Sequence, residues 1–211
     1  MTAVDVRPTT APRGRPRDTG VDEAVHAACT AILAAGGPGD VTVRAIADAA
    51  GVGPATIYRR WSSKDLLLTD TVIRLMEESI PTVLDAPIDE GVLGLTRGWV
   101  HALVATPVGR ALPIIVELAA HEPRVAEAVA AWHLDRRVRV NAMLQRAMDA
   151  GDLRPDVDLG IAVDLLGGPT FYRRVFVSLD IQDPDYAVRL AREFLRWAGW
   201  TGDTATVGVA S

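Results

Sequence analysis

The residues best suited to chemistry lie between positions 55 and 61, where a helical wheel separates two faces. Ile57 and Trp61 fall on one side and predict a packed face. On the other side, arginine can hold guanine or phosphate at two points, a threonine hydroxyl can reach either, and alanine can approach a thymine methyl group. These outward groups favour contact with the DNA major groove. They are Ala55, Thr56, Arg59 and Arg60.

The residues before this segment supply the elements that would position it. Thr42 can cap a short helix that runs to Ala50, and Gly51 then allows a tight exit. Gly53 and Pro54 place a permissive cap and a proline at the first turn of the next helix, which we expect to continue through Trp61. Two short helices joined by a glycine-containing turn predict a helix-turn-helix.

The neighbouring helices complete this small bundle. Apolar residues at helical spacing predict a preceding helix that ends at Gly36–Gly39. Ser62 and Asp65 have the spacing of a capping box and predict the start of a longer fourth helix. Lys64 would lie in its first turn, where free backbone N–H groups also favour phosphate.

Residues 42–67 resemble the DNA-binding signature of the TetR (tetracycline-repressor) family, and with the preceding helix the resemblance covers about residues 21–70. Residues 168–173 resemble a stretch in the C-terminal domains of some members. Pro38 and Trp61 depart from the usual pattern, and neither lies on the groove face. The resemblance implies DNA contacts by Thr42, Arg44, Thr56, Tyr58, Arg59 and Lys64.

Two interpretations remain for the basic residues. Charged side chains on a helix usually form a solvated surface, but the agreement of caps, spacing and signature favours DNA contact here. Residues 1–20 are rich in proline and threonine and predict a flexible arm. The arm is either a tail without a partner or an insert into the minor groove. The insertion would use Arg13, Arg15 and Arg17.

The remainder of the chain predicts an all-α protein with about nine helices. No segment keeps the alternation of a strand, and proline and glycine separate the amphipathic runs. The predicted longer helices cover 89–105, 108–120, 124–150, 158–178 and 184–198. We therefore expect four units, namely a basic arm at 1–20, a helix-turn-helix domain at 21–68, an effector-binding and dimerisation domain at 69–198, and a flexible tail at 199–211.

One basic residue in the larger domain interrupts an apolar face. Arg136 projects from the same stripe as Trp132, and a buried arginine needs a partner. Glu117 or Asp164 could form a structural salt bridge with it, and an acidic effector is the alternative. Met and aromatic stripes are more often plain core than ligand sites. The other candidate ligand-binding residues are Met76, Thr96, Trp99 and Leu103.

The last two long helices have broad apolar arcs. The resemblance implies that two such helices from each protomer form the interface of a homodimer, whereas packing within one chain would use the same stripes. The family architecture favours the dimer. The candidate interface residues are Leu190, Phe194 and Trp197.

Composition excludes several classes of protein. The net charge of −5 excludes nucleic-acid binding by bulk attraction, so a DNA contact needs a local patch. The single cysteine, Cys29, excludes an intramolecular disulfide and a zinc site built from cysteines. No apolar run reaches the roughly 18 residues that a membrane span requires. The N-terminus lacks the apolar core of a signal peptide. No catalytic or phosphate-loop motif is present, and the histidines are scattered.

We therefore predict a cytoplasmic transcriptional regulator that is not an enzyme, has no metal or cofactor, and does not bind a membrane. Its expected partners are a palindromic double-stranded DNA operator and a small, mostly apolar effector that releases it. The competing class is a helical-bundle ligand-binding protein or enzyme with a vestigial helix-turn-helix.

Overall fold

The computed structural model describes residues 19–80, 85–177, 183 and 185–209, and these form helices without strands. The α-helices are α1 (Thr19–Ala35), α2 (Val43–Ala50), α3 (Pro54–Tyr58), α4 (Lys64–Ser79), α5 (Ile88–Ala105), α6 (Val108–His121), α7 (Pro123–Asp149), α8 (Leu159–Phe171) and α9 (Tyr186–Trp197). A short 3-10 helix (Pro38–Asp40) follows α1, and a π-helical turn (Tyr172–Phe176) follows α8. The all-α prediction is confirmed.

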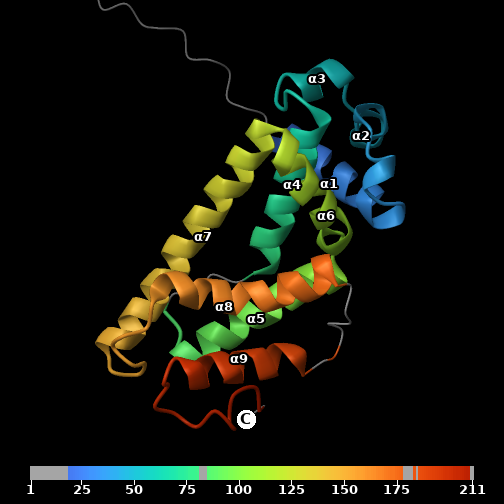
Figure 1. Cartoon of the computed structure of the whole chain (residues 1–211). Helices are drawn as coiled ribbons and strands as arrows, with labels where there is room; N and C mark the ends of the chain where they lie inside the picture. The colour runs from blue at the N-terminus through green and yellow to red at the C-terminus, as the bar shows by residue number, and fades with distance from the viewer. Residues whose placement is uncertain (1–18, 81–84, 178–182, 184, 210–211) are drawn as a thin grey trace, which may run out of the picture.

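Two groups of helices share α4. The first four helices gather at the upper end of the molecule, where α1 packs on α2 and α4 (Figure 1). At the lower end α5 packs on α8 and α9, and the long helix α7 runs obliquely between the two ends (Figure 1). Helix α4 contacts α1 above and α5, α6 and α7 below. Its apolar residues therefore contribute to both parts of the core, as shown by buried Leu67 and Met76.

Local signals explain most helix ends. The Thr42 side chain accepts a hydrogen bond from Ala45 N at 3.1 Å, and Ser63 caps α4 by accepting from Leu66 N at 3.1 Å. The cap is therefore Ser63 rather than the predicted Ser62, because its hydroxyl reaches the free N–H three residues ahead. Helix α3 ends at Tyr58, one turn earlier than predicted. Helix α8 continues through Pro169 before the π-helical turn.

The C-terminal segment differs from the prediction. Residues 199–209 form hydrogen-bonded turns that pack along α9 instead of a frayed tail. Arg192 donates to the carbonyl oxygens of Ala205 and Val207 at 2.9 Å, and the Val207 side chain is buried. Composition suggested flexibility, but Arg192, the buried Val207 and a hydrogen bond from Thr201 N to Asp152 O hold this segment against the bundle.

Among the described residues, no single helix is long and apolar enough to cross a membrane. Helices α5 and α6 reach that length and composition only as a pair, and they are bent by 91° relative to each other. The described part of the chain also contains no cluster of three or more His, Cys, Asp or Glu side chains arranged to hold a metal ion.

Candidate nucleic-acid interface and effector region

Helices α2 and α3 form the predicted helix-turn-helix. The turn is possible because Gly51 adopts a left-handed conformation, with φ of +66°. Val52 N donates to Ala47 O at 3.0 Å and closes the turn. Buried Ile46 and Ile57 face the rest of the small bundle, which leaves the opposite side of α3 in solvent.

Most of the predicted DNA contacts are exposed to solvent in the structure. Tyr58 is 55% exposed, and Arg44 and Lys64 reach carboxylates only at 3.9 and 3.7 Å. Exposed pairs of that kind contribute little, so these side chains can turn toward another partner. Thr56 is half-buried, and its hydroxyl accepts from Arg59 Nη2 at 3.4 Å. The exposed members are Thr42, Arg44, Ala55, Tyr58, Arg59 and Lys64.

Arg60 does not behave as predicted. Its guanidinium forms an ion pair with Asp22 of α1, and its side chain is largely covered. The helical wheel placed Arg60 with the outward residues, but α3 ends at Tyr58 and the chain then turns toward α1. Arg60 therefore ties the turn between α3 and α4 to α1. The arm residues Arg13, Arg15 and Arg17 lie outside the described residues.

An unpredicted polar cluster of Trp61, Asp70, His26 and Thr71 anchors the same turn. Trp61 Nε1 donates to Asp70 Oδ2 at 2.8 Å, and His26 Nε2 lies 3.3 Å from the same oxygen. The other ring nitrogen of His26 lies 2.9 Å from the hydroxyl of Thr71. The hydrogen bond with His26, with a smaller contribution from Trp61, lowers the pKa of Asp70 below its usual value. The charged carboxylate thus stabilises the fold above the ordinary carboxyl pKa, and this contribution is lost on acidification.

In the larger domain, the carboxylate of Glu77 on α4 joins three side chains of α7. Trp132 Nε1 donates to it at 2.6 Å, and Arg139 Nη2 donates to both of its oxygens at 2.9 and 3.1 Å. Arg136 lies 3.9 Å from Glu77 and donates to Ile80 O at 3.3 Å. Burial lowers the pKa of Arg136, and the nearby Glu77 opposes that shift.

The partner of Arg136 was therefore predicted wrongly. Asp164 pairs with Arg137 instead, one residue along α7, and Glu117 on α6 forms no ion pair among the described residues. Charge alone suggested Glu117 and Asp164, whereas the packing of α4 against α7 brings Glu77 close to Arg136. An acidic effector would have to compete with this carboxylate.

The remaining candidate effector residues lie in closely packed surroundings. Met76, Trp99 and Leu103 are buried in the apolar core, and the buried hydroxyl of Thr96 donates to Leu93 O at 3.1 Å. The Trp99 ring packs on Gly167, where a Cβ atom would lie 3.5 Å from it. These side chains do not line either of the two hollows described below.

The hydroxyl of Thr170 is one of several buried polar atoms without a hydrogen-bond partner among the described residues. The side chain of Thr170 lies on α8 and is buried. Thr170 follows Gly167 by one helical turn and therefore lies on the same side of α8 as the contact with Trp99. An unpaired buried hydroxyl is costly, so it marks a position where a ligand atom could be accommodated.

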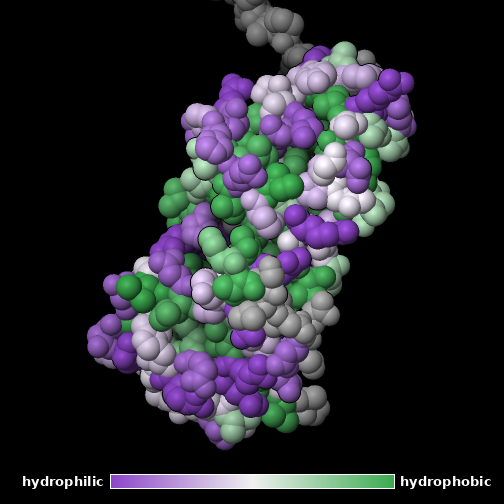
Figure 2. Space-filling model, turned by 45° about the vertical axis from the view of Figure 1, so that its right-hand side comes forward, coloured by the Kyte–Doolittle hydropathy of each residue, from purple (hydrophilic) through white to green (hydrophobic). Residues whose placement is uncertain are grey.

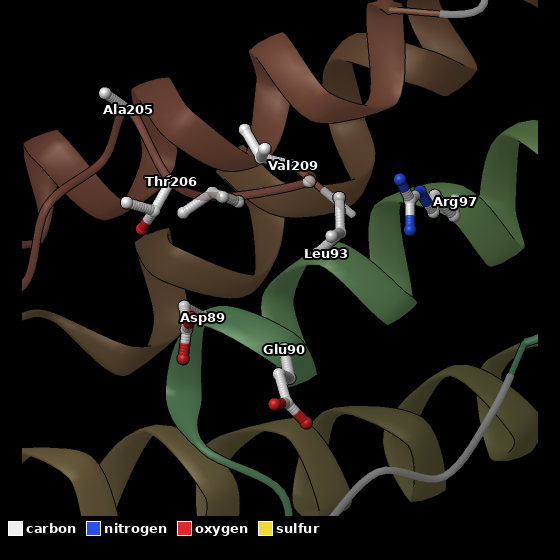
Figure 3. A pocket seen from close by; sticks show the side chains of 9 residues that line it. Asp89, Glu90, Leu93, Arg97, Ala205, Thr206 and Val209 are labelled. Atoms are coloured by element: carbon white, nitrogen blue, oxygen red, sulfur yellow. The ribbon is translucent and has the colours of Figure 1, made fainter. Parts of the chain in front are cut away.

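A hollow of about 650 Å³ lies between α5 and the C-terminal segment (Figure 3). Asp89 and Glu90 come from the first turn of α5, Arg97 lies two turns further along, and residues 205–209 form the other wall. The prediction missed this site because it treated the C-terminal residues as frayed. Its lining combines charged side chains with apolar ones such as Leu93 and Val209, which differs from the mostly apolar site expected for the effector.

The candidate dimer residues do not form an exposed surface. Phe194 is only 3% exposed within one chain and packs beside Trp197, with ring centroids 5.6 Å apart. Trp197 also lies under the guanidinium of Arg154, at 5.0 Å, and Leu190 is half-buried. The prediction that Phe194 faces a second protomer is therefore wrong, because α9 packs this face against α5.

Exposed apolar side chains occur elsewhere, for example Leu134 and Val138 on α7, and four of them lie on α8 and the π-helical turn. These four recur at intervals of four and seven residues and therefore share one face. In another view, hydrophilic residues cover the lower end of the molecule, where α9 lies, and hydrophobic residues gather at mid-height (Figure 2). The exposed residues are Ile161, Leu165, Tyr172 and Phe176.

Comparisons with known proteins agree with this geometry. Residues 26–71 match the model for bacterial regulatory proteins of the tetR family, and residues 88–194 match that for the Tetracyclin repressor-like C-terminal domain. The chain is 27% identical over 172 residues to the uncharacterized HTH-type transcriptional regulator YdeS of Bacillus subtilis, covering 81% of this chain and 86% of that protein. It is 24% identical over 180 residues to the HTH-type transcriptional regulator AqdR of Rhodococcus erythropolis, covering 84% and 86%.

Solved structures share the fold. The TetR family transcription regulator SCO0332 superposes with a TM-score of 0.70 at 26% identity, over 83% of this chain and 97% of that one. FadR from Bacillus subtilis, solved in complex with stearoyl-CoA, superposes with a TM-score of 0.61 at 16% identity, over 85% and 96%.

The contacts of Arg136 predict how two substitutions change the stability of the protein. Arg136→Met should lower the free energy of unfolding by about 1 to 3 kcal/mol, because it leaves Ile80 O without its charged donor and removes the ion pair with Glu77. Glu77→Gln should also destabilise, because it leaves the buried arginine without its carboxylate. Denaturant unfolding of both variants, beside Arg146→Gln at the exposed end of α7, measures this. An unchanged stability of Arg136→Met would contradict the structural role.

Proposed function

Because the chain belongs to the TetR family of bacterial transcriptional regulators, we propose that it binds a palindromic operator as a homodimer and leaves it on binding a small molecule. The observation that carries the proposal is the exposed polar face of the helix-turn-helix. A protein that acts on chromosomal DNA works in the cytoplasm, and we propose that location. Its relatives are regulators, which supports a role without catalysis.

The exposed face divides into two kinds of DNA contact. Ala55 and Thr56 belong to α3, and Arg59 directly follows its last residue. In this type of domain α3 enters the major groove, so these residues can reach base edges. Thr42 and Arg44 at the start of α2, and Lys64 at the start of α4, flank α3 and suit phosphates. Arg60 is assigned to the fold rather than to DNA because of its pairing with Asp22.

Substitutions on this face should weaken operator binding without unfolding the protein. Arg44→Ala and Tyr58→Ala remove exposed side chains, so their melting temperatures should stay close to that of the wild type. Lys64→Ala should weaken specific and non-specific DNA alike and reduce the salt slope by about 1. Mobility shifts with the upstream DNA of the gene, at several salt concentrations, test this. Loss of sequence preference in Lys64→Ala would contradict its assignment to phosphate.

For the dimer we propose the exposed face of α8 and the π-helical turn. Its apolar side chains would be covered by the same face of a second copy, as in an isologous interface. Phe176 is 72% exposed, and its ring stacks on Tyr172 at 6.3 Å between centroids. Regulators of this family form dimers, which supports a self-complementary surface of this kind.

The choice of surface leads to a direct test. Leu165→Glu places a charge on the exposed face of α8 and should yield folded monomers that no longer bind the full palindrome. Phe194→Glu places a charge in the core of one chain and should unfold the domain instead. Sedimentation and circular dichroism separate the two effects. An intact dimer for Leu165→Glu would exclude this face as the interface.

For the effector we propose the core between α5 and α8, around Trp99 and Thr170. The unpartnered hydroxyl of Thr170 would meet the polar end of a mostly apolar molecule, and the surrounding side chains would contact its body. FadR was solved with stearoyl-CoA, which shows that this fold can hold a ligand with a long acyl chain. Because the core is closely packed here, the ligand must displace side chains to enter.

Thr170→Val tests whether this hydroxyl is free. Replacing it with a methyl group of similar size should raise the free energy of unfolding by about 1 kcal/mol, because no hydrogen bond is lost and a costly buried group is removed. Thr96→Val is the matched control, since the hydroxyl of Thr96 donates to Leu93 O. If Thr170→Val destabilises the protein as Thr96→Val does, the hydroxyl already has a partner.

A further inference from the structure

A second hollow lies where the larger domain meets the helix-turn-helix. It has a volume of about 520 Å³ and lies between the end of α3, the first half of α4 and the first turns of α7. Figure 1 places the N-terminal end of α7 beside the start of α4. We call this hollow the junction groove. Its lining includes Tyr58, Arg59, Trp61, Ser62, Asp70 and Arg124.

The contact across the junction groove is made by Arg124. Its Nη1 donates to Ser62 Oγ at 2.8 Å, which brings a guanidinium of α7 to the edge of the helix-turn-helix. Arg124 is exposed, and among the described residues no carboxylate forms an ion pair with it. Since a guanidinium has five N–H donors, most of them remain available for another acceptor.

The charge of the groove is positive. Arg59 donates only to the hydroxyl of Thr56 among the described residues, so its charge is not neutralised by a carboxylate. The groove contains one carboxylate, Asp70, and this group already accepts from Trp61 and contacts His26. Two unneutralised guanidinium groups therefore face a space that an anion can enter.

We propose that the junction groove binds a backbone phosphate of the operator and that Arg124 is a DNA contact supplied by the larger domain. The proposal rests on the operator binding proposed above. DNA is favoured over a small anion because the groove is continuous with the DNA-binding face. Tyr58 and Arg59 line the groove and belong to that face, and Lys64 follows Ser62 by two residues.

This contact would make DNA affinity depend on the position of α7. A phosphate held by both Arg59 and Arg124 spans the two domains, so any shift of α7 relative to α4 would separate the two guanidinium groups. A charge-assisted bond to phosphate is strongly dependent on geometry. The larger domain would thus influence DNA binding directly, through its own cation.

The experiment compares Arg124→Gln with Arg146→Gln on the same helix. Arg146 lies in the last turn of α7, is exposed and pairs with Asp85, so it controls for loss of one exposed charge from this helix. Affinities are measured with the upstream DNA of the gene and with an unrelated duplex over a range of salt concentrations. Arg124→Gln should weaken both several-fold and reduce the salt slope by about 1, whereas Arg146→Gln should match the wild type.

Two further variants distinguish charge from structure. Arg124→Lys keeps the cation and should keep the salt slope, and Ser62→Ala removes the acceptor and should also keep it. If Arg124→Gln retains the wild-type slope, or if Ser62→Ala reproduces its loss of affinity, the role of Arg124 is structural and the proposal is overturned.

Thermal melts with inorganic phosphate test the small-anion alternative. Phosphate stabilisation that disappears in Arg124→Gln, while the salt slope on DNA stays unchanged, would indicate a free-anion site and overturn the DNA assignment. Absence of DNA binding by the wild type would overturn the proposed function together with this inference. A reduced salt slope in Arg124→Gln and Lys64→Ala, with the wild-type slope kept in Arg146→Gln, supports both.

Discussion

The packing of α4 against α7 depends on the hydrogen bonds and ion pairs that the carboxylate of Glu77 makes. This carboxylate accepts hydrogen bonds from Trp132 and Arg139 and neutralises the buried Arg136, all on one face of α7. A buried cation without a partner would be strongly unfavourable, so α4 and α7 cannot slide past each other without breaking these contacts. Apolar packing alone is less directional and would tolerate such a shift. The register of α4 on α7 is therefore set by charge.

The upper end of α4 is held by different polar contacts. Asp70 binds Trp61 and His26, Arg60 pairs with Asp22, and α7 reaches over to Ser62 through Arg124. The helix-turn-helix is thus connected to α1, α4 and α7 by hydrogen bonds and ion pairs around its exit. Because α4 is also held at Glu77, a change in the core near α7 can be transmitted to the DNA-binding face through one continuous helix.

Much of the fold could be predicted because its signals are local. Thr42, Gly51 and Pro54 each act on the backbone within three or four residues, so the helix-turn-helix and its exposed face followed from them directly. The longer helices were also placed within a few residues of their observed ends, since proline and glycine interrupt them. The solvent-facing residues of α2 and α3 could be identified without knowledge of the rest of the molecule.

The sequence by itself determined the number and order of the helices, the approximate positions of most of their first residues and the exposure of Arg44, Tyr58 and Arg59, because helical periodicity and capping act over one turn. Only the tertiary structure decided which of several similar apolar helix faces would be buried and which carboxylate would pair with a buried arginine. Phe194 lies on an apolar stripe like that of α8, but it is buried within its own chain, where α9 packs on α5. For Arg136 the pattern suggested Glu117 or Asp164, whereas α4 presents Glu77. Such choices depend on contacts between segments far apart in the chain, for which no local pattern carries a signal.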